Sequence, residues 1–425
     1  MLSANKDGVF YGWRIVGVSF LAQFLAMGCS ISIFGLFIPV LTSEFGASTM
    51  EANLGLSILT IFMAGSGAVI GPMLDKRSIR GVMISGTVLA SVSFFLMSMA
   101  TELWQLALLF GVGIAIGAAM FGPLAANTVV AKWFSQNRGK AVGIASMGAP
   151  TGGFLLAPLI GFLLADSGWR DTLVIISAMH LTLIPLLWLV IRNQPEDLGL
   201  TTDGIETIET EVLVQGRIWT TAQVFRAPNF WFLALAFGVA GVVAGSWNAN
   251  VIPYSGDIGI GVDKASFFPS ALGGTALLGT LIFGTLADKI SIRLLLWSSF
   301  LMQGASFIFI RLIQPEFTSL MAAILVFGLA AGAMMPLMAA AIGRGFGPAS
   351  FGRVMGFIGP VTLPFGFIGP PLVGYIRDVT GSYILAFDLF LVIFILASLI
   401  LLGLKLPSIA KSNDQEGGAV EERNI

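Results

Sequence analysis

The chain has 425 residues, of which 56% are hydrophobic and only 11% are charged. Soluble domains carry roughly 25% charged residues, so this chain has too few charges to cover a water-exposed surface. Its net charge of −1 gives no indication of nucleic-acid binding, and the sequence has no basic patch that would neutralise phosphates. A single cysteine, Cys29, excludes an internal disulfide, and no Cys/His cluster indicates a metal or cofactor. The composition is that of an integral membrane protein.

Long stretches without Asp, Glu, Lys or Arg recur along the chain. A helix needs about 20 apolar residues to cross a bilayer. Eleven such stretches of at least 17 residues occur in chain order: 15–43, 52–74, 81–101, 103–131, 141–165, 172–191, 227–256, 265–287, 294–310, 317–343 and 354–376. A twelfth run, 379–404, is interrupted only by Asp388. Barrel strands would alternate polar and apolar residues, so the sequence predicts an all-α membrane protein with twelve transmembrane helices.

The charges of the connecting segments predict the orientation. If the N-terminus lies inside, 18 of the 22 Lys and Arg residues fall on the inner side and 4 on the outer side. Because positive loops stay in the cytoplasm, both termini are predicted there, with the chain crossing the cytoplasmic (inner) membrane many times. The predicted parts are an N-terminal six-helix half (1–192), an acidic cytoplasmic linker (193–226), a C-terminal six-helix half (227–406) and a polar tail (407–425).

A repeated segment follows the second and the eighth predicted helix. Gly71–Arg80 (GPMLDKRSIR) recurs as Gly284–Arg293 (GTLADKISIR), with six of ten positions identical at an offset of 213 residues. The same offset maps Gly161 and its neighbouring glycines and prolines in predicted helix five onto Gly374 and its neighbours in predicted helix eleven. The two halves are therefore a duplication, an arrangement found in transporters with a central site at the repeat interface.

The repeated motif resembles that of the major facilitator superfamily, and the resemblance covers nearly all of residues 10–406. It implies that both copies form gating loops on the cytoplasmic side, where a carboxylate at a helix end can pair with a base or a helix N-terminus. The alternative is that these charges only fix the topology. The residues of the two loops are Gly71, Asp75, Lys76, Arg80, Gly284, Asp288, Lys289 and Arg293.

A closer resemblance is to the branch of monocarboxylate porters and oxalate–formate antiporters. It rests on Gly12-Trp13 before the first helix and on Trp133-Phe134-x-x-x-Arg138-Gly139-Lys140 before the fifth. Anion carriers of that branch place a buried Arg in helix eight or a Lys in helix eleven, whereas 265–287 and 354–376 contain no charge here. A carboxylate without a cation would lose several kcal/mol of hydration, so this departure argues against a simple anion.

Polar residues inside the predicted helices are the candidates for function. Two are ionisable, His180 and Asp388, and are candidates for proton coupling; packing and an interface position are the alternatives. The uncharged candidates for solute binding are Gln23, Ser30, Asn127, Trp247, Asn248, Asn250 and Tyr254. Amides both donate and accept hydrogen bonds and aromatic rings stack, so the helix-seven group suits a planar solute. Its alternative is an aromatic belt at the outer interface.

The sequence therefore predicts a secondary transporter that works by alternating access, with a small-molecule substrate and the lipid bilayer as its partners. It is expected to function as a monomer and by symport with a proton, without catalytic residues, cofactor, metal or nucleic acid. The leading solute class is neutral or weakly ionised, with planar, vitamin-like heterocycles taken up by the cell. The alternatives are a monocarboxylate or related organic anion moved with a proton, and efflux of amphipathic compounds.

Overall fold

A computed structural model of the chain describes residues 10–134, 137–202, 219–287, 289–314, 316–347 and 350–406. Within those ranges the chain forms helices and short connections, without any strand. The helices of the first half of the chain are α1 Gly12–Met27, α2 Phe34–Glu44, α3 Thr49–Lys76, α4 Ile79–Ser98, α5 Leu103–Leu108, α6 Ala115–Phe121, α7 Pro123–Trp133, α8 Arg138–Ser146 and α9 Gly148–Val190.

The helices that follow the linker are α10 Thr221–Arg226, α11 Pro228–Asp257, α12 Val262–Ala265, α13 Phe267–Leu286, α14 Ile292–Leu312, α15 Phe317–Gly332, α16 Met334–Phe346, α17 Phe351–Thr380 and α18 Ile384–Ile400. Short 3₁₀ turns occur at Pro195–Leu198 and Leu401–Gly403. The middle of the predicted linker, 203–218, and the predicted tail, 407–425, lie outside the described residues.

Ten helices within the described ranges are long and apolar enough to cross a bilayer. One of them, Lys140–Val190, has 51 residues and contains two of the predicted spans. The two spans are separated at Gly168, whose φ of 78° is non-helical and lies in the left-handed region that favours glycine. The predicted stretches 141–165 and 172–191 are six residues apart. In the structure the helical backbone is interrupted between them at Gly168 alone.

The contacts divide the chain into two compact units, and each is described by itself. Unit 1 comprises Met1–Glu211, Gly245–Gly274 and Phe367–Tyr383, and unit 2 comprises the remaining segments up to Ile425. Unit 1 thus combines the predicted N-terminal half with parts of α11, α13 and α17. The predicted boundaries at the linker stay a prediction.

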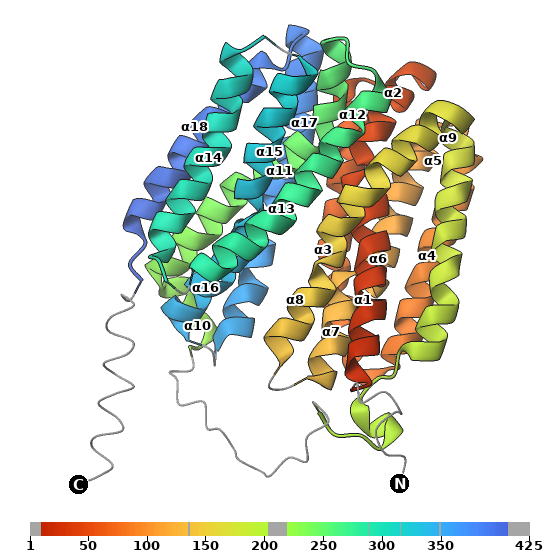
Figure 1. Cartoon of the computed structure of the whole chain (residues 1–425), viewed down its shortest axis with the longest axis vertical. Coiled ribbons are helices and arrows are strands. Elements are labelled where there is room, and N and C mark those ends of the chain that lie inside the picture. The colour runs from red at the N-terminus through yellow and green to blue at the C-terminus, as the bar shows by residue number, and fades with distance from the viewer. Residues whose placement is uncertain are drawn as a thin grey trace. The chain divides into compact units, whose positions relative to one another are not determined.

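In unit 1, α9 packs along both α1 and α4, and these helices lie side by side (Figure 1). The close approach of α9 to α1 depends on Gly148 and Gly152, because a Cβ at either position would collide with the backbone of α1. The helix α3 begins with a capping box in which the Ser48 side chain accepts from the Glu51 amide, and the Glu51 carboxylate accepts from the Ser48 amide.

Two glycines of unit 1, Gly161 and Gly374, occupy equivalent positions in the sequence repeat and make equivalent contacts. A Cβ on Gly161 would collide with the side chain of Ser266 at the start of α13, and a Cβ on Gly374 would lie 2.7 Å from the backbone of Met50 at the start of α3. Each glycine therefore lets the fifth helix of one repeat approach the beginning of the second helix of the other repeat.

Unit 2 is built around phenylalanine. Phe307 of α14 lies with its ring centroid 5.0 Å from Phe390 of α18 and 5.6 Å from Phe327 of α15. Aromatic pairs at these distances add stability beyond the area that they bury. The helices α13 and α15 approach through Gly279 and Gly332, where a Cβ would meet a carbonyl of the opposite helix.

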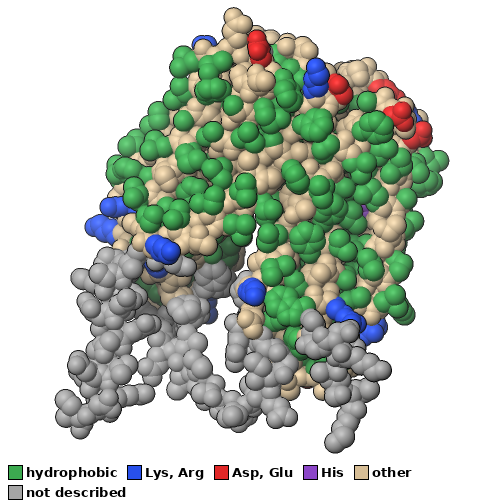
Figure 2. Space-filling view, viewed as in Figure 1, with side chains coloured by type: hydrophobic (Ala, Val, Ile, Leu, Met, Phe, Trp, Pro, Cys, Tyr) green, Lys and Arg blue, Asp and Glu red, His purple; other side chains and the backbone are tan. Residues whose placement is uncertain are grey.

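The surface of each unit is apolar in its middle. Hydrophobic side chains cover the visible middle of each unit, and the visible charges lie toward its ends, as expected for a lipid-facing surface (Figure 2).

Two segments in unit 1, Gly28–Ser32 between α1 and α2 and Leu109–Ile114 between α5 and α6, are π-helical. A π turn inserts an extra residue into a helix, and such turns often occur at functional sites.

Candidate solute site and gating loops

Three uncharged polar side chains from separate helices meet inside unit 1. The Asn127 Oδ1 atom on α7 accepts a hydrogen bond from Gln23 Nε2 on α1 at 3.0 Å and from Ser146 Oγ on α8 at 3.2 Å. Gln23 is buried, whereas Asn127 remains partly exposed. We call these three residues the amide cluster. Its members keep unused hydrogen-bonding capacity, since each amide offers two donors and an acceptor.

The local structure explains how Asn127 reaches this position. The helix α6 ends at Phe121, Gly122 adopts a non-helical conformation, and α7 begins with Pro123. Proline is favoured in the first turn of a helix, where its missing N–H costs nothing. This break starts a new helix just before Asn127 and sets the direction of the α7 face that carries it.

The two predicted amides of helix seven have partners inside unit 1. Asn248 Nδ2 donates to the carbonyl of Ile31 at 2.8 Å. Asn250 is buried, and its Oδ1 accepts from Asn53 Nδ2 at 2.9 Å, while its own Nδ2 donates to the Ser246 carbonyl at 2.9 Å. These amides hold α11 against the first two predicted helices.

The aromatic members of the helix-seven group are also packed within unit 1. Trp247 and Tyr254 are 2% and 8% exposed, and their ring centroids are 6.5 Å apart. Tyr254 also meets the ring of Tyr383 edge to face at 5.8 Å. Burial raises the pKa of Tyr383, so its phenol stays neutral over the physiological range. These contacts join the helix-seven group to Ile31, Asn53 and Tyr383.

The remaining membrane candidates have local partners. Ser30 lies in the first π-helical segment and donates its hydroxyl hydrogen to the carbonyl of Ala26 in α1. His180 is buried between the rings of Phe94 and Phe121, at centroid distances of 5.2 and 5.7 Å, with Nδ1 at 2.8 Å from the Ile176 carbonyl. Asp388 lies 3.5 Å from Arg311, and both side chains are about half exposed.

The structure describes the two gating loops in part. The helix α3 runs through Asp75 to Lys76, whereas Asp288 lies outside the described residues. The guanidinium of Arg80 lies 4.9 Å from the ring centre of Trp188. In unit 2, Arg293 donates to the carbonyl of Leu404 at 3.4 Å, and Lys289 is exposed.

Two basic residues that sequence reasoning treated only as topology signals contact these loops. Lys132 Nζ donates to the carbonyl of Leu74 at 3.3 Å in unit 1, and Arg344 donates to the carbonyl of Ala287 in unit 2. Leu74 and Ala287 are equivalent in the repeat, since 287 − 74 = 213, and each precedes the acidic residue of its motif. Cations at helix C-termini are favourable, so the two motifs share an anchoring contact. A comparison of the two halves at the repeat offset of 213 residues misses this contact by one position, because Lys132 and Arg344 are 212 residues apart. The two residues also differ in type.

A second missed feature ties α17 to α3 in unit 1. The Asp378 carboxylate accepts from the backbone amides of Thr49 at 3.0 Å and Met50 at 2.8 Å, at the N-terminus of α3. A carboxylate is stabilised there by the unpaired amides and the helix dipole. Beside it, Arg377 forms a two-pronged ion pair with Asp257 at 2.6 and 3.0 Å.

A family model described as Major Facilitator Superfamily matches residues 19–274 and 243–423. Monocarboxylate transporter 12 of Mus musculus is 27% identical over 91% of this chain and 83% of its own length. Monocarboxylate transporter 13 of Rattus norvegicus is 28% identical over 89% of this chain and 85% of its own. These relatives confirm the resemblance to the monocarboxylate branch.

A solved structure supports the fold alone. It is that of a bacterial homolog to the human lysosomal transporter Spinster, in an inward-facing and unoccupied conformation. It superposes with a TM-score of 0.72 at 19% identity, over 95% of this chain and all of the other. The relatives are transporters rather than enzymes, and the same holds for this multi-pass membrane chain.

Proposed function

Because the chain belongs to the Major Facilitator Superfamily, we propose that it carries a small, neutral or weakly ionised organic solute by alternating access. The amide cluster is the observation that carries this proposal. Gln23, Asn127 and Ser146 bring donors and acceptors from three helices to one place without a fixed charge. Uncharged polar groups of this kind pair with carbonyl, amide or ring-nitrogen groups of a solute. Planar heterocycles of the vitamin type have such groups.

The absence of a cation supports the same solute class. None of the eleven uninterrupted apolar stretches contains Lys or Arg, and the twelfth contains only the acidic Asp388. Burying an ionised carboxylate without a partner disfavours its charged form. A neutral solute loses less hydration when it enters such a site.

A monocarboxylate moved together with a proton is the second candidate, favoured by the names of the two relatives above. A carboxylic acid could enter in its neutral form, but an acid with a pKa near 4 is only about 0.1% protonated at pH 7. Transport of such an acid by this chain would therefore increase steeply as the external pH falls. Efflux of amphipathic compounds remains the third candidate.

The test is uptake by proteoliposomes at pH 7. Labelled neutral heterocycles and labelled lactate, pyruvate, formate and oxalate are each offered, and each is also used unlabelled as a competitor. We expect saturable uptake of an uncharged heterocycle and no competition from the four acids. Saturable uptake of a simple monocarboxylate at pH 7 would contradict the neutral-solute proposal and favour the second candidate.

We further propose that the chain crosses the cytoplasmic membrane twelve times with both termini inside, and that uptake by a monomer is coupled to a proton. The support for the number is that α9 contains two spans joined at Gly168 and that α3, with 28 residues, is long enough to add another to the ten. Fusing a cytoplasmic reporter to each terminus tests the topology. A pH gradient imposed on proteoliposomes tests the coupling, and size-exclusion with light scattering tests the monomer.

A further inference from the structure

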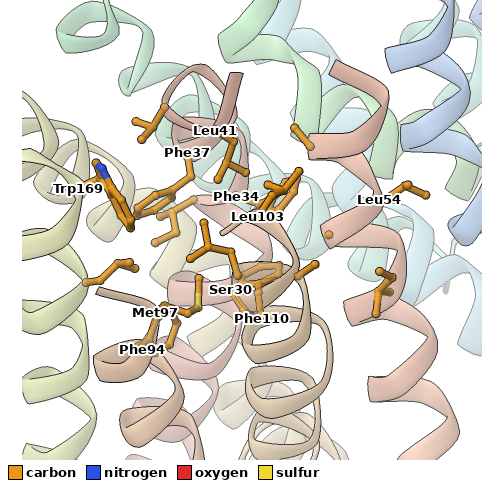
Figure 3. Close-up of a pocket in the computed structure, with 18 of the residues that line it drawn as sticks. Ser30, Phe34, Phe37, Leu41, Leu54, Phe94, Met97, Leu103, Phe110 and Trp169 are labelled. Carbon is orange, nitrogen blue, oxygen red and sulfur yellow. The ribbon is translucent and has the colours of Figure 1, made fainter. Parts of the chain in front are cut away.

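An apolar cavity of about 260 Å³ lies inside unit 1, apart from the amide cluster. Its wall consists mainly of aliphatic and aromatic side chains from α2, α3, α4, α5 and α9, and Cys29 and Ser30 also line it. Figure 3 shows Phe34, Phe94 and Phe110 around the open space. This cavity is larger than the roughly 150 Å³ apolar cavities that stay dry and bind benzene.

Three polar groups of the wall already have hydrogen-bond partners within the protein. The Ser30 hydroxyl donates to Ala26, the Glu51 carboxylate accepts from the Ser48 amide at 2.8 Å, and Trp169 Nε1 donates to Glu44. A polar solute in this cavity would therefore lose its hydration and find few new hydrogen bonds, which is unfavourable. The wall selects an apolar occupant.

Both π-helical segments of unit 1 border this cavity. Cys29 and Ser30 belong to Gly28–Ser32, and Phe110 belongs to Leu109–Ile114. An α-helix in place of either segment would remove one residue from the turn and rotate the wall residues that follow. The two irregular turns therefore set the shape of this space.

The rim of the cavity lies at helix ends. Glu51 is in the first turn of α3, Trp104 is the second residue of α5, and Trp169 follows the bend at Gly168. Trp104 is 64% exposed. Tryptophan is enriched at the level of the lipid headgroups, so an acyl chain can enter here while its headgroup stays at this level.

We propose that this cavity is a binding site for one acyl chain of a membrane phospholipid. The chain contacts the phenylalanines and Cys29, and the headgroup lies near Trp104. In a bilayer, acyl chains are the apolar molecules present at the highest concentration, which makes them the occupant that the wall chemistry and the rim favour. The proposal does not depend on which solute the protein carries.

The first experiment counts bound lipid. Purified full-length protein is stripped of lipid in mild detergent, incubated with 1-palmitoyl-2-oleoyl-phosphatidylglycerol and examined by native mass spectrometry. Ala107 lines the cavity, and Ala107→Phe fills part of it; Ala178→Phe is the matched control on an exposed face of α9 outside the wall. We expect the wild type and A178F to retain a tightly bound phospholipid and A107F to lose it. Equal retention by all three would overturn the proposal.

The second experiment needs no variant. Cys29 is the chain's single cysteine and lines the cavity, so its modification by methyl methanethiosulfonate reports on the occupant. We expect the phospholipid to slow the modification of delipidated wild-type protein, and the headgroup analogue glycerol 3-phosphate to leave it unchanged. The proposal fails if the phospholipid does not slow modification, or if glycerol 3-phosphate protects Cys29 equally well.

Discussion

Asn53 and Asn250 form a buried side-chain pair in unit 1, with Asn53 Nδ2 donating to Asn250 Oδ1 at 2.9 Å. The two residues are 197 positions apart, so their pairing ties α3 to α11. Each amide also bonds to its own helix backbone, since Asn53 donates to the Thr49 carbonyl and Asn250 to the Ser246 carbonyl. The pair is therefore held in one orientation from both sides.

The first prediction concerns this pair. We expect Asn53→Ala and Asn250→Ala each to lower stability by about 1–3 kcal/mol, because each leaves the partner amide buried with an unmet hydrogen bond. The double variant should lose less than the sum of the two, with a coupling of about 0.5–3 kcal/mol. Chemical unfolding in detergent measures this cycle. Strictly additive losses would mean that the two amides do not stabilise each other.

The second prediction concerns the amide cluster. Asn127→Ala should weaken solute binding by about 1–3 kcal/mol, the usual effect of removing a hydrogen-bonding partner from a desolvated site. Thr128→Ala is the matched control, since its hydroxyl donates to the Leu124 carbonyl within the same helix. Binding is measured by isothermal titration with the transported solute. The same affinity in both variants would remove Asn127 from the proposed site.

The third prediction concerns the anchors of the gating loops. Lys132→Met and Arg344→Met remove the contacts to the carbonyls of Leu74 and Ala287. We expect both variants to transport more slowly with an almost unchanged affinity, because the proposed role of the loops is to gate and not to bind the solute. Initial rates over a range of solute concentrations separate the two parameters. Lys264→Met removes an exposed base within α12 and is the control. Wild-type rates in both loop variants would mean that Lys132 and Arg344 only fix the topology.

The fourth prediction concerns the cap on α3. Asp378→Ala should lower stability by about 0.5–2 kcal/mol, because the amides of Thr49 and Met50 lose their acceptor. Asp378→Asn keeps one acceptor oxygen and should lose less. Thermal unfolding compares both variants with Asp171→Ala, which removes an exposed acid three residues after the Gly168 bend. A loss of stability in D171A as large as that in D378A would argue against a specific cap.

The fifth prediction concerns proton coupling. His180→Phe should retain pH-driven uptake, because the imidazole is enclosed by Phe94 and Phe121 and bonds to its own helix at Ile176. Asp388→Asn should also retain pH-driven uptake, because its ion pair with Arg311 is half exposed and such pairs contribute little free energy of stabilisation. Uptake under an imposed pH gradient is the measurement. Loss of the gradient response in either variant would make that residue part of the proton path.

Hydropathy and charge predicted the membrane class, because it depends on long runs that survive any local irregularity, whereas the family was predicted from the repeated motif Gly71–Arg80. The same runs could not reveal the π-helical segments, since an extra residue in a turn leaves composition unchanged. They also left residues 166–171 between two predicted spans, where the structure has a single bend at Gly168. Charged residues indicate where a helix leaves the membrane, but they do not indicate how many residues the turn needs.

The candidate site was predictable by residue type and only partly by position. Gln23 and Asn127 were chosen as polar residues on separate helices, and the structure brings them together with Ser146. Asn250 was chosen for the same reason, yet its partner Asn53 could not be found, because pairing over 197 positions depends on tertiary packing. The cavity beside Cys29 has no sequence pattern at all, since its wall comes from five helices.

The equivalent contacts of Gly161 and Gly374 bear on how such a chain can change over generations. After the duplication, one gene encodes the same contact at two positions. A mutation at one position leaves the other unchanged. A larger residue at Gly374 would press on the Met50 backbone, while Gly161 would still fit against Ser266. The descendants of one ancestral half can thereby acquire unequal mobility, and the rates at which the carrier opens to the two sides of the membrane can diverge.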